Sequence, residues 1–218
     1  MDDLSEREQL DAIKKWWNEN GKAIIAGLVV GLGAVFGWQY WQKWQNQVAE
    51  EASAIYRGVT SSITAAGVQE DGLRQLQENH ARSPYAALAA LAAASRMVEE
   101  DQLDKAREHL QWSADNASQI ELANLSQLRL ARVLWALGER DAALDRLDAV
   151  DKPFRSLADE IRGDIYRESG DTDKARSAYQ AAQSALSLKG ANDSWLQMKL
   201  EDLARAEPGS MGGTDSGQ

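Results

Sequence analysis

The first residues that could do chemistry are four glycines in the stretch GLVVGLGAVFGW, Gly27–Trp38. Closely spaced glycines can form a phosphate-binding loop, because they let backbone N–H groups approach the phosphate. Gly31 and Gly33 begin the dinucleotide-binding pattern G-x-G-x-x-G, but Phe36 occupies the place of the third glycine. No lysine completes a Walker-type loop, and no β-branched strand precedes the stretch. The spacing therefore argues against a phosphate site.

Residues with reactive side chains are sparse in this chain. The chain has no cysteine, which excludes disulfides and thiolate chemistry, and its two histidines, His80 and His109, are too few for a three-histidine zinc site. No G-x-S-x-G, H-E-x-x-H or calcium-loop motif is present. The charge run EDQLDKARE around Asp101 is typical of a solvated helix turn. We therefore expect no enzyme activity, no metal and no cofactor.

Bulk composition restricts the partners. The 218 residues are 44% hydrophobic and carry a net charge of −10. This mixture is typical of a folded chain, and the length fits one anchor or tail plus one domain. Nucleic-acid binding depends on basic residues that neutralise phosphates, so the acidic balance argues against a nucleic-acid partner.

The glycine-rich stretch has the properties of a membrane-spanning helix. Between Lys22 and Lys43, the 20 residues 23–42 carry no charge. A helix of that length is about 30 Å long, the thickness of the hydrocarbon core. Five of the eight tryptophans flank it, as expected at bilayer interfaces: Trp16, Trp17, Trp38, Trp41 and Trp44. We predict a transmembrane helix at residues 21–42. The small-residue triplet Ala52–Ala54 lies too far beyond the apolar run for a signal-peptide cleavage site, so the anchor should be uncleaved.

The basic residues around this helix predict its orientation. Four of them precede the uncharged stretch 23–42 and two follow it closely: Arg7, Lys14, Lys15 and Lys22, then Lys43 and Arg57. The positive-inside rule places residues 1–20 in the cytoplasm. Residues 43–206 would then lie in the periplasm, with the helix in a bacterial inner membrane as a single-pass anchor. The tail 207–218 lacks apolar periodicity, and we expect it to be disordered.

The same glycines form two G-x-x-x-G pairs, Gly27 with Gly31 and Gly33 with Gly37. Such spacing lets helix backbones approach closely within lipid. One interpretation is a packing face toward another membrane protein. Small residues are also common in any spanning helix, so the pattern alone leaves both interpretations open.

The rest of the chain is helical in pattern and repeats itself. Five equivalent positions recur 32 residues apart: Ala131 and Gly163, Leu134 and Tyr166, Gly138 and Gly170, Ala143 and Ala175, Leu147 and Tyr179. This pattern resembles the tetratricopeptide repeat, in which two antiparallel helices pack through small residues. The glycines at 138 and 170 suit the turn that ends the first helix.

Less regular units flank these two. Upstream, Ala94, Met97, Ala106 and Leu110 occupy corresponding positions, with Asp101 at the turn. Because Ala106 and Ala143 are 37 residues apart, we expect one longer linker, around residues 116–119. A weaker fourth unit would include Ile63, Gly67, Leu76 and Pro84, and a terminal helix at 192–206 would cover the last pair. The predicted fold is thus all-α: an anchor followed by a solenoid of three to four helix pairs and a capping helix.

Such a fold without catalytic motifs indicates recognition of other proteins. The first helix of each pair lines the concave surface of a repeat array. By periodicity the candidates for a protein-binding groove are Leu91, Leu128, Arg132, Trp135, Glu160, Asp164 and Arg167. Trp135 would be the strongest anchor for a partner, although it fits a core position equally well.

Three stretches together resemble a known family. They are NENGKAIIAGLVVGLGAVFGWQYWQ, the repeats that contain Leu128–Arg132 and Gly163–Ala178, and LQMKLEDL near the end. Over about residues 10–206 the chain resembles the YfgM family, ancillary subunits of the SecYEG translocon. The glycine-rich ending after Pro208 departs from the family.

The resemblance implies a single-span inner-membrane protein with its N-terminus in the cytoplasm and a periplasmic repeat domain. It implies association with the SecYEG translocon and the periplasmic chaperone PpiD. The expected role is assistance to exported client polypeptides as they fold or move on. The alternative is a regulatory adaptor that binds a signalling protein through the acidic segment 1–19.

Overall fold

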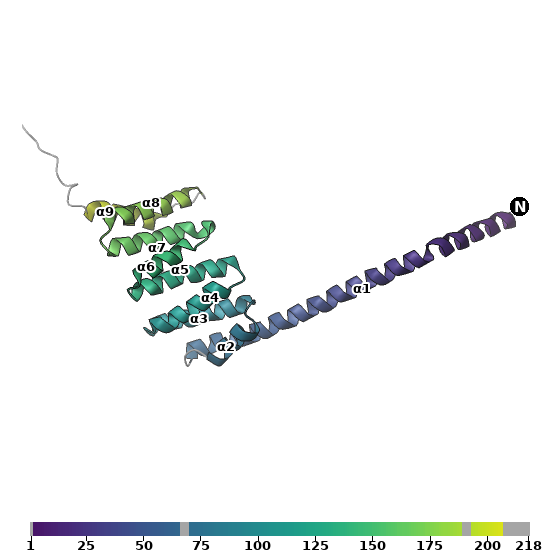
Figure 1. Ribbon diagram of the computed structural model, residues 1–218, viewed down its shortest axis with the longest axis horizontal. Helices are drawn as coiled ribbons and strands as arrows, with labels where there is room; N and C mark the ends of the chain where they lie inside the picture. Colours follow the sequence, from purple (N-terminus) through teal and green to yellow (C-terminus); the bar gives the residue numbers. More distant parts are fainter. Residues whose placement is uncertain (1, 66–69, 189–192, 207–218) are drawn as a thin grey trace, which may run out of the picture. The chain divides into compact units, whose positions relative to one another are not determined.

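The computed structural model describes residues 2–65, 70–188 and 193–206, and every element in these ranges is a helix (Figure 1). The predicted disordered tail 207–218 and the repeat position Gly67 lie outside the described residues. The chain divides into two compact units, residues 1–51 and 52–218. We call the second the repeat unit and describe each unit by itself.

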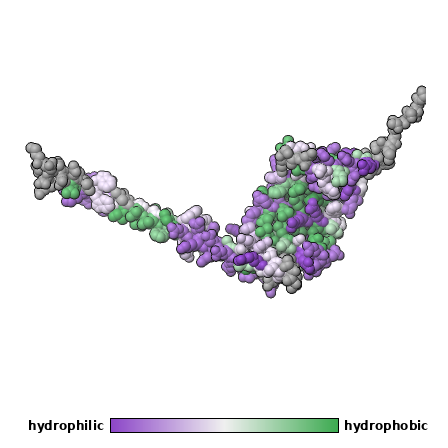
Figure 2. All heavy atoms as spheres, turned by 180° about the vertical axis from the view of Figure 1, so that it is seen from behind, coloured by the Kyte–Doolittle hydropathy of each residue, from purple (hydrophilic) through white to green (hydrophobic). Residues whose placement is uncertain are grey.

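The first unit is made by helix α1, Asp2–Ala65, which continues into the repeat unit. Its middle carries exposed apolar side chains such as Val30 and Phe36. Figure 2 shows a hydrophobic band along the middle of this helix. Among the described residues, no single straight helix has both the length and the apolarity needed to cross a bilayer. Two segments of α1, Lys14–Lys22 and Ile25–Ser62, meet both criteria together and are bent by 45° relative to each other. The structure thus indicates the predicted anchor only weakly.

The repeat unit stacks helices that are neighbours in sequence. Its elements are α2 (Glu70–Asn79), α3 (Pro84–Glu99), α4 (Leu103–Asn116), α5 (Ile120–Ala136), α6 (Arg140–Asp148), the 3₁₀ turn η1 (Lys152–Phe154), α7 (Arg155–Glu168), α8 (Thr172–Ser187) and α9 (Ser194–Ala206). α3 packs with α4, α5 with α6 and α7 with α8, and the first helices of these pairs also contact one another. Ser83 caps α3 by accepting a hydrogen bond from the Tyr85 N–H at 3.3 Å, and Pro84 fits the first helical position because it has no N–H to leave unpaired.

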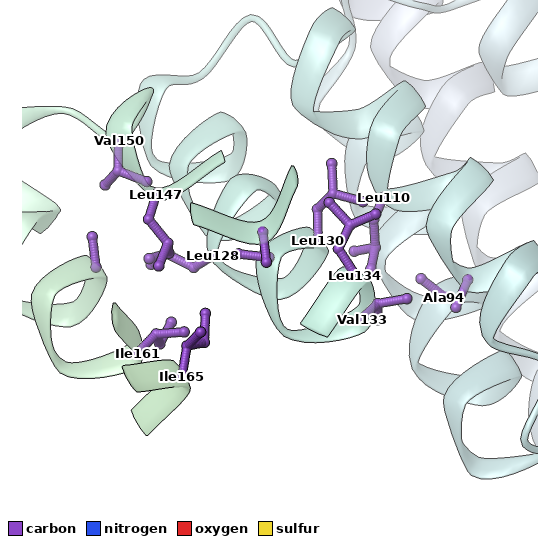
Figure 3. Packing of buried hydrophobic residues seen from close by; sticks show 14 of the residues in the cluster. Ala94, Leu110, Leu128, Leu130, Val133, Leu134, Leu147, Val150, Ile161 and Ile165 are labelled. Carbon is purple, nitrogen blue, oxygen red and sulfur yellow. The ribbon is translucent and has the colours of Figure 1, made fainter. Parts of the chain in front are cut away.

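The core follows the repeat that the sequence predicts. One apolar cluster combines side chains from α3 to α7 (Figure 3). Its alanines at the equivalent positions 94, 106, 131 and 143 are almost completely buried, since small side chains let paired helices touch. Two smaller clusters lie at the ends: Ala52, Val59, Leu73 and Leu76 pack with α3, and Tyr179 and Ala182 of α8 pack with Leu196 and Leu203 of α9.

The three hairpin turns share one backbone conformation. Asp101, Gly138 and Gly170 have φ of 60°, 82° and 79°. After each of them, the next N–H closes the turn: that of Glu139 donates to the Leu134 carbonyl and that of Asp171 to the Tyr166 carbonyl, both at 2.9 Å. This is the Schellman pattern of helix termination. The prediction that Asp101 replaces a turn glycine is confirmed.

The expected longer linker at residues 116–119 is wrong. α4 is followed by only three linking residues, 117–119, whereas 149–154 separate α6 from α7. The extra residues lie inside the helices, because α4 has 14 residues and α6 has 9, while α5 has 17 and α7 has 14. Repeat spacing alone cannot distinguish a longer helix from a longer loop.

Candidate protein-interaction site

A groove lies between α3 and α5, the first helices of two successive pairs. It consists of two adjoining hollows, one of about 480 Å³ and one of about 240 Å³, which share Ser95 and Arg129 as lining residues. We call the two together the α3/α5 groove. Its position follows from the repeat, since equivalent helices of neighbouring pairs lie side by side and expose matching faces.

The groove is mainly apolar. The wider hollow is lined by Leu88, Leu91, Ala92 and Leu125, and the narrower one by Ala94, Val98, Leu103, Leu110, Val133 and Ala136. Val98 and Leu125 remain 44% and 36% exposed although they are large apolar residues. On the face seen in Figure 2, hydrophobic residues also gather over the middle of the repeat unit, with hydrophilic residues among them. Exposed apolar surface of this kind is typical of protein-binding sites.

Basic side chains border the apolar lining. Arg129 and Arg132 lie one turn apart on α5 and are exposed. In the part of the chain that the structure describes, neither guanidinium forms an ion pair or a hydrogen bond. Arg96 of α3 is different, because it pairs with Glu99 at 3.3 Å and with Glu100 at 2.8 Å. The unpaired positive charge of the groove is therefore on α5.

Of the residues predicted for the groove, four belong to α3 and α5. Arg132 lines the narrower hollow. Leu91 lines the wider hollow and is only 3% exposed. Leu128 is part of the core, and Trp135 is half-buried and packs against the same core cluster. The structure thus brings Leu91 and Arg132 together at one site.

The other three predicted residues lie on α7, the first helix of the last pair. Glu160 and Asp164 of α7 both bind Lys199 of α9: its Nζ lies 2.7 Å from Glu160 Oε1 and 2.8 Å from Asp164 Oδ1. The Lys199 side chain is only 11% exposed, so this contact is largely removed from water. The capping helix therefore covers the acidic pair. Arg167 lines a separate hollow of about 120 Å³ with the exposed Trp195 and Met198 of α9.

Tyr179 of α8 belongs to the same polar network. Its hydroxyl donates a 2.7 Å hydrogen bond to Asp164, and the Lys199 ammonium lies 5.5 Å from the centre of its ring. Burial, together with this hydrogen bond, raises the pKa of Tyr179 well above its usual value. The network joins α7, α8 and α9 through side chains far apart in the sequence.

Sequence reasoning missed Arg129, Ser95 and Val98 as groove residues, and Lys199 as the partner of the acidic pair. A signal for Arg129 exists, since it lies one helical turn from both Leu125 and Arg132 and so shares their face. No local signal exists for Lys199, which is 35 residues beyond Asp164.

Titratable groups elsewhere have structural surroundings. Burial lowers the pKa of His109 on α4 below its usual value, against the opposing effect of Glu108 and Glu70. The hydrogen bond from Arg140 holds the pKa of Asp171 below its usual range. Among the described residues, no group of three or more histidine, aspartate or glutamate side chains is arranged to hold a metal ion.

The glycines of the two G-x-x-x-G pairs lie on the exposed middle of α1. A Cβ atom built on Gly27, Gly31, Gly33 or Gly37 would meet no other group within 4 Å. The described residues of the first unit therefore leave room for a side chain at these four positions.

Comparisons with known proteins place these features in a wider context. A family described as "Tetratricopeptide repeat-like domain" matches residues 14–205.

The chain is similar to three proteins named "Ancillary SecYEG translocon subunit". The protein from Escherichia coli (strain K12) is 31% identical over 201 residues, which cover 92% of this chain and 97% of the relative. The protein from Aggregatibacter actinomycetemcomitans is 36% identical over 83% of this chain and 89% of the relative. The protein from Haemophilus influenzae (strain ATCC 51907 / DSM 11121 / KW20 / Rd) is 30% identical over 92% of this chain and 98% of the relative. No solved structure matches the chain.

Proposed function

The chain belongs to the family of ancillary SecYEG translocon subunits, with a tetratricopeptide repeat-like domain, and from this premise we propose that it is a membrane-anchored interaction module at the translocon. One observation carries the proposal: the matched region, residues 14–205, includes both the apolar segment of α1 and the repeats. Because one family match spans both parts, it supports the proposal that the anchor and the repeats act together.

The anchor is the first part of the proposal. Residues 21–42 would span a bacterial inner membrane once, with the N-terminus in the cytoplasm and the repeat unit in the periplasm. The uncharged stretch, its flanking tryptophans and the excess of basic residues before it support this arrangement. The exposed apolar side chains of α1 support it too, because lipid would cover them.

The glycines extend this proposal to a contact inside the membrane. Gly27, Gly31, Gly33 and Gly37 have open space around them, so a neighbouring helix could approach the backbone closely. The two G-x-x-x-G pairs lie on different faces of the helix, since Gly31 and Gly33 are only two residues apart. We propose that α1 packs through at least one of these pairs against a helix of the translocon or of PpiD.

The repeat unit is the second part. The α3/α5 groove combines exposed apolar residues with unpaired positive charge, which suits a polypeptide partner. We propose that the unit receives exported clients as they leave the channel and that it acts together with PpiD. The proposed outcome is help with their periplasmic folding or trafficking.

Copurification tests the association. The tagged full-length chain, extracted in mild detergent, should bring SecY and PpiD with it. In a variant with residues 21–42 replaced by an unrelated spanning helix without glycine, recovery of the partners should fall if the anchor makes the contact. A wild-type chain that recovers neither partner would disprove the proposal.

Cysteine labelling tests the topology. Because the chain has no native cysteine, Glu19→Cys and Asp115→Cys each introduce a single thiol. A membrane-impermeant maleimide should label position 115 in intact spheroplasts and position 19 only after lysis. The reverse pattern would invert the proposed orientation.

A further inference from the structure

Two arginines of the α3/α5 groove indicate which charge a ligand of the groove should carry. The chain carries 34 acidic and 24 basic side chains, so acidic groups outnumber the basic groups with which they could form ion pairs. Elsewhere in the repeat unit Arg107, Arg140 and Arg162 form ion pairs within the chain. In the groove itself, Arg96 pairs with Glu99, which also lines the wider hollow, and with Glu100. Arg129 and Arg132 form none among the described residues, although both line the groove.

Their surroundings favour an acidic ligand. A guanidinium next to apolar surface has fewer waters around it than one in open solvent, so a carboxylate that approaches it gains more from the pairing. Leu125, Val98 and Val133 supply this apolar surface beside the two arginines. A ligand that fills the groove must offer apolar side chains to these residues and negative charge to α5.

The length of the groove sets the size of the segment. From Leu88 to Val98 the α3 face extends for about 15 Å at the helical rise. An extended chain covers this length with about five residues, and its alternate side chains point to the same side. The two arginines are about 4.5 Å apart along the α5 axis, within reach of carboxylates on alternate residues of such a chain.

We propose that the α3/α5 groove binds short extended polypeptide segments in which two acidic side chains stand next to bulky apolar ones. This inference deepens the proposed function, since it names the kind of client segment that the repeat unit receives. It predicts discrimination by charge as well as by hydrophobicity, because a basic segment of equal hydrophobicity would face Arg129 and Arg132.

The test uses the purified full-length chain in detergent and three fluorescent 12-residue peptides. The first carries two aspartates at alternate positions among leucines and valines, and the others have asparagine or lysine in their place. Fluorescence anisotropy should show that the aspartate peptide binds about tenfold or more tightly than the asparagine peptide, and the lysine peptide most weakly. Binding of the aspartate peptide should weaken as salt is raised, because the pairing is partly exposed.

Variants place the binding in the groove. Arg129→Gln with Arg132→Gln should abolish the preference for aspartate, and Arg129→Glu with Arg132→Glu should reverse it in favour of lysine. The matched control is Arg74→Gln with Arg205→Gln, which removes equal charge from exposed sites and should keep the preference. All four positions lie on the surface, and circular dichroism of each variant checks the fold.

The results separate this inference from the proposed function. Equal affinity for all three peptides, no binding, or an unchanged preference in the Arg129 and Arg132 variants would overturn the inference. None of these results concerns association with the translocon, which the copurification experiment measures. Failure of copurification would in turn leave the peptide preference standing.

Discussion

The ring of Tyr179 lies directly against the backbone of Gly163, so that a Cβ atom on Gly163 would stand 2.3 Å from Tyr179 Cε1 and 2.4 Å from Cδ1. Tyr179 is completely buried, and its hydroxyl is held by Asp164. One repeat earlier the equivalent residues are Ala131 and Leu147, both buried as well. A smaller residue on the first helix thus accompanies a larger one on the second.

This relationship predicts the effect of one methyl group. Gly163→Ala should lower the free energy of unfolding by about 1–3 kcal/mol, because the buried ring cannot move away without disturbing the core. Gly163→Ala with Tyr179→Leu recreates the pair of the preceding repeat and should recover part of the loss. Urea unfolding of the full-length chain measures both. An alanine variant as stable as the wild type would contradict the close packing of α7 and α8.

Removing the charge of Lys199 should loosen the capping helix. Lys199→Met leaves Glu160 and Asp164 close together without their cation, and we expect a loss of about 2 kcal/mol. Hydrogen exchange should show faster exchange of the α9 amides. Lys105→Met, at an exposed position of α4, is the matched control and should leave α9 unchanged.

Neutralising the acidic pair tests the same contact from the other side. In the Lys199→Met background, Glu160→Gln with Asp164→Asn removes the repulsion and should restore part of the protection of α9. If α9 exchanges equally in wild type and in Lys199→Met, the ion pairs do not hold the helix.

Acidification should destabilise the repeat unit through His109. Because burial lowers its pKa in the folded state, the unfolded chain takes up a proton first as pH falls through the usual value of 6.5. The contribution of His109 to stability is therefore complete above this pH and is lost as pH falls toward its folded-state pKa. His109→Gln should flatten the pH dependence of the urea midpoint between about pH 7 and 5. A wild-type midpoint that rises over this interval on acidification would contradict the assignment.

Substitutions at two of the hairpin turns, Asp101 and Gly138, should change the free energy of unfolding in opposite directions. Asp101→Gly should raise the free energy of unfolding by about 0.5 kcal/mol, since glycine adopts a positive φ without steric cost and this gain exceeds its extra entropy loss. Gly138→Ala should lower it by about 1 kcal/mol for the converse reason. Thermal unfolding of the two variants side by side is the measurement. Equal shifts in one direction would show that the turn conformation does not control stability at these positions.

Local signals in the sequence predicted most of the fold. The turn residues, the buried alanines and the pairing of helices follow from short-range spacing, which each repeat carries within itself. The length of α4 was not predictable, because residues added to a helix or to a loop change the spacing equally. The bend in α1 was not predictable either, since hydropathy reports the apolar character of a segment and not its straightness.

The candidate site was predictable only in part. Leu91 and Arg132 were predicted from the rule that first helices line the binding face, and both line the α3/α5 groove, while their role in binding stays a prediction. Glu160 and Asp164 of α7 satisfied the same rule, but Lys199 of α9 pairs with both of them. Such a contact depends on how the last helix packs, which no local pattern encodes.

The ion pairs of Lys199 also have a consequence for assembly. A stack of helix pairs ends in a surface shaped to receive another pair, and two molecules could join end to end through such surfaces without limit. α9 covers this surface with Leu196 and Leu203, and its Lys199 forms ion pairs with both members of the acidic pair. α9 therefore covers the C-terminal end of the stack, and filament growth from this end would first require α9 to detach.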